Sequence, residues 1–269
     1  MINKSDLKIM DTHAHLDMPH FDADRQEVIK RAQDAGVSLI NTIGIDVESS
    51  RRCIQLTEKY SGVVASIGIH PQEAGNVTEK DIRILQEVAG YPGVVAIGEL
   101  GLDFFHREPS REAQIRVLRW ELELAAKAKL PVIVHCRQAR EDMMAIIADW
   151  CESYSIADNT FRGVLHCFSG DIQTADWYIQ KGFFISIGAY VSYPSSAKLR
   201  ETVSNLPLEK LVVETDSPFL PPQKYRGQRN EPSYSVFTVN TLAEIRQISL
   251  EEMARQTSQN ARRLFNLTL

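Results

Sequence analysis

Two histidines stand one residue apart near the start of the chain, within the segment DTHAHLDM at residues 11–18. The mostly apolar residues 7–10 before it predict a short β-strand that leads into this segment. Side chains two residues apart on an extended strand point to the same side. His13 and His15 can therefore direct two imidazoles to one point, which is what a metal ion requires.

More side chains that can bind a metal ion stand where later apolar runs end. They are Glu99 in IGEL, His135 in IVHC, His166 in VLHC and Asp216 in ETDS. Five of the seven histidines occupy such ends, since His70 in GIHP joins the four already named. Imidazole together with carboxylate suits transition ions such as Zn²⁺, Mn²⁺, Fe²⁺ or Co²⁺ better than it suits Mg²⁺.

Six converging ligands are too many for one catalytic zinc ion, which keeps one coordination position open. Two ions about 3.5–4 Å apart, bridged by a carboxylate and a water, use all six ligands and leave room for a substrate. The sequence therefore predicts two divalent cations as the cofactor, such as Mg²⁺, Mn²⁺ or Zn²⁺. The expected ligands are His13, His15 and Asp216 for one ion and His135 and His166 for the other, with Glu99 as the bridge.

Apolar runs of strand length alternate with longer amphipathic stretches from one end of the chain to the other. Val and Ile are frequent in these runs, and their near-continuous apolarity is typical of parallel strands covered on both faces. The predicted strands are residues 7–11, 37–42, 63–69, 94–99, 132–135, 163–166, 183–187 and 211–214. The predicted helices are residues 22–35, 78–88, 111–129, 139–153, 172–181, 197–205, 234–246 and 250–265.

This alternation in 269 residues predicts an α/β fold, a (β/α)8 TIM barrel, as one domain over residues 1–269. An open doubly wound sheet is the alternative, but it normally carries a glycine-rich phosphate loop after its first strand. This chain has DTHAHLDM at that place, which favours the barrel. The carboxyl ends of barrel strands meet at one mouth, so the six ligands are expected to converge there.

The composition excludes some classes of protein. A hydrophobic fraction of 43% and a charged fraction of 24% are those of a soluble globular protein with a full core. The formal net charge of −5 argues against a nucleic-acid binder held by charge alone. Four cysteines without CxxC spacing predict a reduced, cytoplasmic setting. No apolar run approaches the length of a membrane span, so no membrane partner is expected.

Seven short motifs follow one another along the chain: DTHAHLD, GIHP, GELGLDF, VIVHCR, LHCFSG, ETDSPFL and QRNEP. In order and spacing they resemble the TatD family of metal-dependent hydrolases, from Asp11 to about Asn260. The resemblance implies a (β/α)8 barrel of the amidohydrolase type. It also implies a divalent-metal phosphodiesterase with deoxyribonuclease activity, which is a 3′→5′ exonuclease in some members.

A metal ion lowers the pKa of a bound water toward neutrality, and a carboxylate beside that water can take its proton. We expect Asp216 to be this general base and Glu99 to take part in catalysis as the bridge between the ions. Carboxylates that orient the ligand imidazoles through their free N–H groups are expected next to them. These are Asp11, Asp103 and Glu214.

Cationic and polar side chains near the strand ends are candidates to bind the substrate, because guanidinium groups match phosphate oxygens. They are Arg137, His70 and Arg229, with Lys224 and Arg226 in the same basic loop, residues 221–232, as Arg229. Two readings remain open for the loop at Phe104 and Phe105. The two rings either stack on bases, as in proteins that bind single strands, or pack the loop.

Two other functions are compatible with the same residues. The first is a small-molecule amidohydrolase or lactonase, although such barrels often bridge their ions with a carboxylated lysine where this chain has Glu99. The second is a metal-binding protein that has lost catalysis, which six intact ligands disfavour. The expected partner is DNA or another phosphodiester, with RNA and small phosphoesters also open. The sequence leaves the oligomeric state open and is compatible with a monomer.

Overall fold

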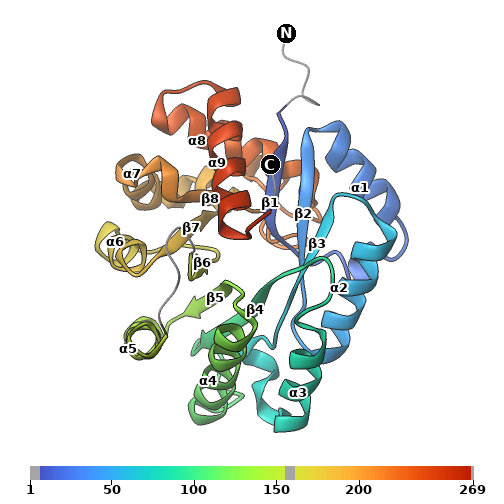
Figure 1. Cartoon of the computed structure of the whole chain (residues 1–269). Helices are drawn as coiled ribbons and strands as arrows, with labels where there is room; N and C mark the ends of the chain where they lie inside the picture. Colours follow the sequence, from blue (N-terminus) through green and yellow to red (C-terminus); the bar gives the residue numbers. More distant parts are fainter. Residues whose placement is uncertain (1–6, 155–160, 268–269) are drawn as a thin grey trace.

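Eight apolar segments pair into one parallel sheet, in the order in which they occur along the chain. The computed structural model describes residues 7–154 and 161–267. The strands are β1 (Ile9–Ala14), β2 (Val37–Ile43), β3 (Val63–Ile67), β4 (Val94–Asp103), β5 (Val132–Arg137), β6 (Gly163–Leu165), β7 (Phe183–Ile187) and β8 (Leu211–Val213). A parallel bridge between Ala14 and Ser217 brings the two edges of the sheet together. The sheet forms a nearly closed barrel, so the predicted (β/α)8 fold is confirmed (Figure 1).

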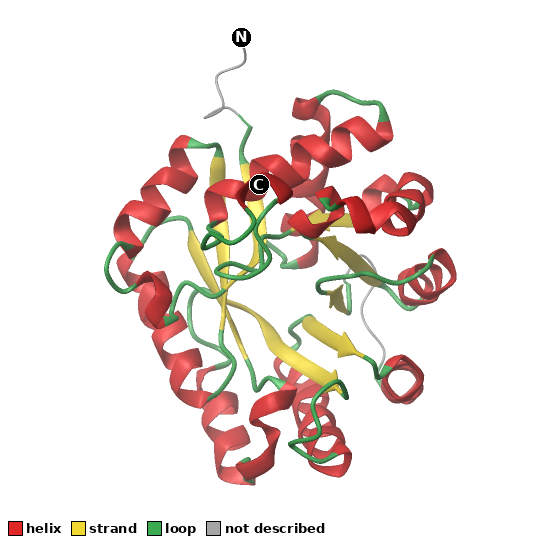
Figure 2. Ribbon diagram, turned by 180° about the vertical axis from the view of Figure 1, so that it is seen from behind, coloured by secondary structure: helices red, strands yellow, loops and turns green. Residues whose placement is uncertain are grey.

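Helices follow the strands and form the outer layer of the barrel, as Figure 2 shows from behind. They are α1 (Arg25–Asp34), α2 (Val47–Lys59), α3 (Glu79–Val88), α4 (Arg111–Ala128), α5 (Arg140–Ser153), α6 (Ile172–Gln180), α7 (Ala197–Asn205), α8 (Ser235–Arg246) and α9 (Leu250–Leu264). All eight predicted helices are present, and Thr78 caps α3 as predicted. Within the described residues, no helix has both the length and the apolar character that crossing a membrane requires.

The sequence pattern missed α2, the helix between β2 and β3. Its buried residues are Ser49, Ser50, Cys53, Ile54 and Leu56, so serines occupy buried positions at which an amphipathic pattern expects apolar side chains. The small Ser50 lets α2 approach the chain just after β2, where a Cβ added to Gly44 would lie 2.7 Å from Ser50 Cα. Asp46 was the available signal, since its carboxylate accepts the Ser49 N–H at 2.6 Å, as N-cap residues do.

One buried apolar cluster joins seven strands to the end of α9. Its members are Met10, Ile43, Val95, Ala96, Ile133, Val164, Phe184, Val212, Ala261, Leu264 and Phe265. Most of the strand residues stand second in their strands, so the cluster lies at the amino end of the barrel. The interior of such a barrel is a packed core and not a pore. Polar groups that do chemistry are therefore gathered at the opposite, carboxyl end of the strands.

Candidate metal centre

The carboxylate of Glu99, on β4, lies among five imidazoles, and each of its oxygens faces a different set of them. Oε2 lies 3.2 Å from Nε2 of His13 and 3.8 Å from Nε2 of His15. These two Nε2 atoms, at the end of β1, are 3.3 Å apart. Oδ1 of Asp216, after β8, lies 3.5 Å from His15 Nε2 and 3.8 Å from His13 Nε2. The first three predicted ligands thus direct their ligand atoms to one point beside Oε2.

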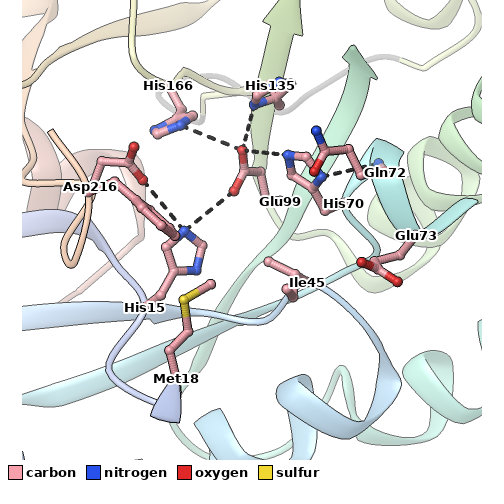
Figure 3. Close-up of a pocket in the computed structure, with 11 residues that line it drawn as sticks. His15, Met18, Ile45, His70, Gln72, Glu73, Glu99, His135, His166 and Asp216 are labelled. Carbon is pink, nitrogen blue, oxygen red and sulfur yellow. Dashed lines mark hydrogen bonds and ion pairs between the residues drawn. The ribbon is translucent and has the colours of Figure 1, made fainter. Parts of the chain in front are cut away.

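The other oxygen of Glu99, Oε1, faces the second set of imidazoles (Figure 3). It lies 2.8 Å from Nδ1 of His135 on β5 and 3.5 Å from Nε2 of His166, just after β6. Nε2 of His70, after β3, is 3.6 Å from the same oxygen. The structure therefore brings all six predicted ligands together around one carboxylate. A carboxylate with one ligand set at each oxygen is the arrangement that a bridge between two ions requires.

Glycine is required just before Glu99 because β4 and β5 approach closely there. Gly98 has φ +151°, and a Cβ added to it would lie 2.7 Å from the Cβ of Ile133 on β5. A larger residue would push β4 away from β5, and the carboxylate of Glu99 would move with it. This contact explains the first glycine of the GELGLDF motif.

Hydrogen bonds decide which ring nitrogen two of the histidines turn toward the centre. Nδ1 of His15 lies 3.1 Å from the carbonyl oxygen of Ile43, and Nδ1 of His166 lies 3.1 Å from Oε2 of Glu214. A carbonyl oxygen only accepts, so Nδ1 of His15 carries a proton and donates it. Nε2 of both rings is left facing Glu99, as metal-ligating imidazoles require.

The donor atoms of the centre fit a pair of divalent cations. Nε2 of His15 faces carboxylate oxygens of Glu99 and Asp216, so either a second proton or a cation must lie between them. Nδ1 of His13 is buried and has no hydrogen-bond partner among the residues that the structure describes. Imidazole nitrogens mixed with carboxylate oxygens are the donor set that transition ions prefer. The residues present therefore match the predicted cofactor.

Charges in the centre lower the pKa of Glu99 and raise that of His166. Burial raises the pKa of Glu99, but the imidazoles of His166 and His13 outweigh it and hold that pKa well below its usual value. Burial opposes protonation of His166, yet the carboxylates of Glu214 and Glu99 raise its pKa to about 10. The carboxylate of Glu99 is therefore ionised, and its negative charge favours positive charge at the middle of the centre.

Comparison with known proteins agrees with this geometry. The family model described as TatD related DNase matches residues 10–266. The chain belongs to the TatD family of metal-dependent hydrolases. The resemblance of the seven motifs is thereby confirmed.

Individual TatD relatives match this protein over nearly their whole length. YabD of Bacillus subtilis, called an uncharacterized metal-dependent hydrolase, is 36% identical over 259 residues, which are 96% of this chain and 99% of YabD. A protein of Erwinia tasmaniensis named 3′-5′ ssDNA/RNA exonuclease TatD is 34% identical over 265 residues, covering 96% of this chain and all of the relative. The crystal structure of the TatD homologue YjjV from Escherichia coli K12 superposes with a TM-score of 0.90 at 32% identity, over 97% of this chain and 99% of YjjV.

Glu214 and Asp103 contact the imidazoles that they were predicted to orient in this TatD protein. Oε2 of Glu214 accepts from His166 Nδ1, and its Oε1 accepts the Cys167 N–H at 2.8 Å. Oδ2 of Asp103 lies 3.4 Å from His135 Nε2. Glu214 therefore fixes the His166 ring through a hydrogen bond, whereas Asp103 faces His135 as an ion-pair neighbour; each ring presents its other nitrogen to Glu99.

We expect Glu214→Gln to weaken metal binding by about 10- to 100-fold without unfolding the protein. A glutamine amide that turns its N–H₂ group toward His166 forces Nδ1 of that ring to accept, which moves the proton to Nε2 and blocks that ligand atom. Titration calorimetry with Mn²⁺ measures the affinity, and thermal unfolding monitors the fold. Glu252→Gln, on the outer surface of α9, is the control and should leave the affinity unchanged. Equal affinities in the two variants would refute the role of Glu214.

Asp11 lies close to His13 but does not contact its ring. Oδ1 accepts the backbone N–H groups of His13 and Thr215 at 3.3 and 2.9 Å, and Oδ2 accepts the Thr215 hydroxyl at 2.6 Å. Burial raises the pKa of Asp11 to about 7. The carboxylate thus joins β1 to the segment that carries Asp216, and it positions the centre through the backbone instead of through an imidazole N–H.

One of the predicted substrate contacts, His70, lines the cavity of the centre, whereas Arg137 lies at the end of β5 and is not among the side chains that line it. Nδ1 of His70 accepts the Gln72 N–H at 3.1 Å, which leaves the ring proton on Nε2. Burial lowers the pKa of His70 to about 4, so the ring is neutral. It can donate one hydrogen bond into the pocket. Arg137 ends β5 with its guanidinium 3.8 Å from the centre of the Phe105 ring.

The predicted phosphate contact at Arg229 is engaged elsewhere. Its Nη1 and Nη2 donate to the two carboxylate oxygens of Asp24 at 2.8 and 2.7 Å, and Nη1 also donates to the carbonyl of His20. This guanidinium is held by Asp24 and His20, and Arg229 is not among the side chains that line the cavity of the centre. Lys224 and Arg226, from the same loop, lie over tyrosine rings. Arg229 therefore secures the loop, and we do not retain it as a substrate contact.

Sequence reasoning overlooked Asn230, which follows Arg229 in the QRNEP motif. Its side chain is fully buried. Nδ2 donates to the carbonyl oxygens of Thr215 and Phe219 at 2.8 and 2.6 Å. Asn230 thus fixes the loop that carries Asp216. The available signal was an uncharged residue within a basic loop, just before Glu-Pro.

Proposed function

We propose that this TatD protein hydrolyses phosphodiester bonds at the 3′ ends of single-stranded DNA or RNA, with two divalent cations as its cofactor. The observation that carries the proposal is the division of the histidines between the two oxygens of Glu99, with His13 at 3.2 Å from one and His135 at 2.8 Å from the other. The Erwinia tasmaniensis relative is named a 3′-5′ ssDNA/RNA exonuclease. That name supports nucleic acid as the substrate.

The six ligands define where the cations would be held. One cation would be held by His13, His15 and Asp216, and the other by His135 and His166. Glu99 would contact both cations. Bound there, the cations would place positive charge against the phosphoryl oxygens and make a nearby water more acidic. Above the ligands lies a cavity of about 180 Å³, which gives a phosphodiester access to them.

Asp216 is the group best placed to take a proton from the attacking water. Its side chain is 14% exposed to the cavity, against 3% for Glu99. Burial raises its pKa, but contacts with His15 and His166 outweigh this and lower the pKa below its usual value. The carboxylate is therefore ionised and able to accept a proton, as a general base must be.

His70 and Arg137 would bind the phosphate in complementary ways. The Nε2–H of His70 points toward the centre, 3.6 Å from Glu99 Oε1, and can be donated to a phosphoryl oxygen. Arg137 stands at the carboxyl end of β5, two residues after His135. Its guanidinium can approach the next phosphate along the strand.

A cleavage assay with Mn²⁺-loaded protein tests the proposal. Single-stranded oligonucleotides labelled at the 5′ end should shorten stepwise from the 3′ end, faster than the same sequence in a duplex, and EDTA should stop the reaction. Bis-p-nitrophenyl phosphate should be hydrolysed as well. Hydrolysis of amides or lactones without hydrolysis of phosphodiesters would contradict the proposal and favour a small-molecule hydrolase. Metal binding without any turnover would contradict it in favour of a protein that has lost catalysis.

A further inference from the structure

We infer that Phe219 forms a platform on which the nucleobase next to the scissile phosphodiester stacks, an inference that rests on the function proposed above. Phe219 follows Asp216 by three residues and is 44% exposed. It lines the same cavity as the metal ligands, together with Met18 and Ile45. Figure 3 shows Met18 and Ile45 on the side of the pocket opposite His135 and His166. The cavity thus has an apolar wall beside its polar floor.

The platform is held rigidly relative to the general base. The Phe219 N–H donates to the carbonyl of Asp216 at 2.8 Å. The buried Asn230 side chain donates to the carbonyls of Phe219 and Leu220, and the Asn230 N–H donates to the carbonyl of Pro218. The backbone beneath the exposed ring is therefore fixed in advance, so only rotation of the Phe219 side chain is lost when a flat ligand binds.

Among the described residues, Phe219 differs from Phe104 and Phe105 in that no cation lies over its ring. Arg137 lies 3.8 Å from the ring centre of Phe105, and Arg111 lies 4.4 Å from that of Phe104. The ring contacts of Phe219 are edge-on, with His15 and His20 at 6.1 Å each. In the described part of the chain, no ring stacks flat on Phe219 and no cation covers it. The base contact first considered for Phe104 and Phe105 is therefore better assigned to Phe219.

The size of the cavity indicates which part of the substrate reaches this wall. Its volume of about 180 Å³ is below the roughly 300–1,000 Å³ of pockets that enclose a small-molecule ligand. The cavity accommodates the phosphodiester, while the attached base must lie on the rim. Every base has a π face, so stacking on an aromatic ring tolerates any sequence. A base that lies on the rim no longer stacks on or pairs with its neighbours in the nucleic acid. The rim therefore favours an unpaired strand end.

Oligonucleotides without bases at the cleavage point test this inference. One substrate carries normal nucleotides, and the other carries tetrahydrofuran abasic residues on both sides of the scissile bond. We expect the wild-type protein to prefer the normal substrate by about tenfold in kcat/KM, since aromatic stacking accounts for that order of selectivity. Phe219→Ala should reduce the ratio to about one, and Phe219→Trp should retain it. Tyr91→Ala is the matched control, because Tyr91 is also 44% exposed but lies just before β4, away from the cavity.

Methyl p-nitrophenyl phosphate, which has no base, separates failure of the inference from failure of the proposed function. Wild-type cleavage of this ester and of both oligonucleotides, without any preference for bases, would overturn the inference and leave the proposed function standing. An equal loss on both oligonucleotides in Phe219→Ala would also overturn it, because the ring would then act only by supporting His15. A wild-type protein that cleaves no phosphodiester would overturn both.

Discussion

Glu99→Gln should lower kcat/KM by about a thousandfold or more and reduce bound metal below two ions per chain. The reason is that the substitution removes the negative charge of the carboxylate that both divalent ions would share. The carboxylate of Glu99 is the group that faces both ligand sets, with Oε2 toward His13 and Oε1 toward His135. A glutamine can offer one oxygen to one set and must offer an N–H₂ group to the other. The expected result is thus a protein that binds one ion at most and turns over substrate very slowly.

Elemental analysis together with steady-state kinetics measures both effects, and Glu121 supplies a matched control. Glu121, on α4, is as deeply buried as Glu99, and its Oε1 accepts the Ile69 N–H at 2.7 Å. Burial raises its pKa well above the usual value, so a neutral amide is a close replacement. Glu121→Gln should retain two ions per chain. A Glu99→Gln protein that also retains two ions would show that Glu99 is not the bridge.

Asp216→Asn should lower kcat by about 10²- to 10⁴-fold while the protein remains folded, since an amide cannot accept the proton of the attacking water. Asp216 has φ +57°, a left-handed conformation that asparagine also tolerates, so the substitution adds no backbone strain. Its N–H still donates to the carbonyl of His13. We therefore expect an unchanged melting temperature together with a large loss of turnover.

The ratio of the two kinetic parameters distinguishes a base from a ligand alone. If Asp216 takes the proton, kcat falls and KM changes little at saturating Mn²⁺. If it only binds metal, raising the Mn²⁺ concentration should restore most of the rate. Near-normal turnover in Asp216→Asn, at any metal concentration, would refute both roles.

The fold and the convergence of the six predicted ligands could be predicted because both depend on local pattern. Buried parallel strands are apolar throughout, and the barrel topology places His13, Glu99 and His166 at one mouth whatever the detailed packing. The helix α2 escaped prediction because Ser49 and Ser50 take buried positions near its start, where such predictions rely on apolar side chains.

The rest of the site depends on contacts that the sequence does not encode locally. Arg229 is bound by Asp24, which lies 205 positions away along the chain, so its basic side chain looked available for phosphate. The proton position on His70 follows from one backbone N–H of Gln72. Phe219 resembles any aromatic residue in a loop until the surrounding cavity and the uncovered ring are seen.

The metal content and its location test the central claim most directly. Protein loaded with Mn²⁺ and crystallised should show two anomalous peaks per chain, one among His13, His15 and Asp216 and the other beside His135 and His166, with Glu99 contacting both. Elemental analysis of the same sample should give two ions per chain. A single peak, or peaks away from Glu99, would contradict the account.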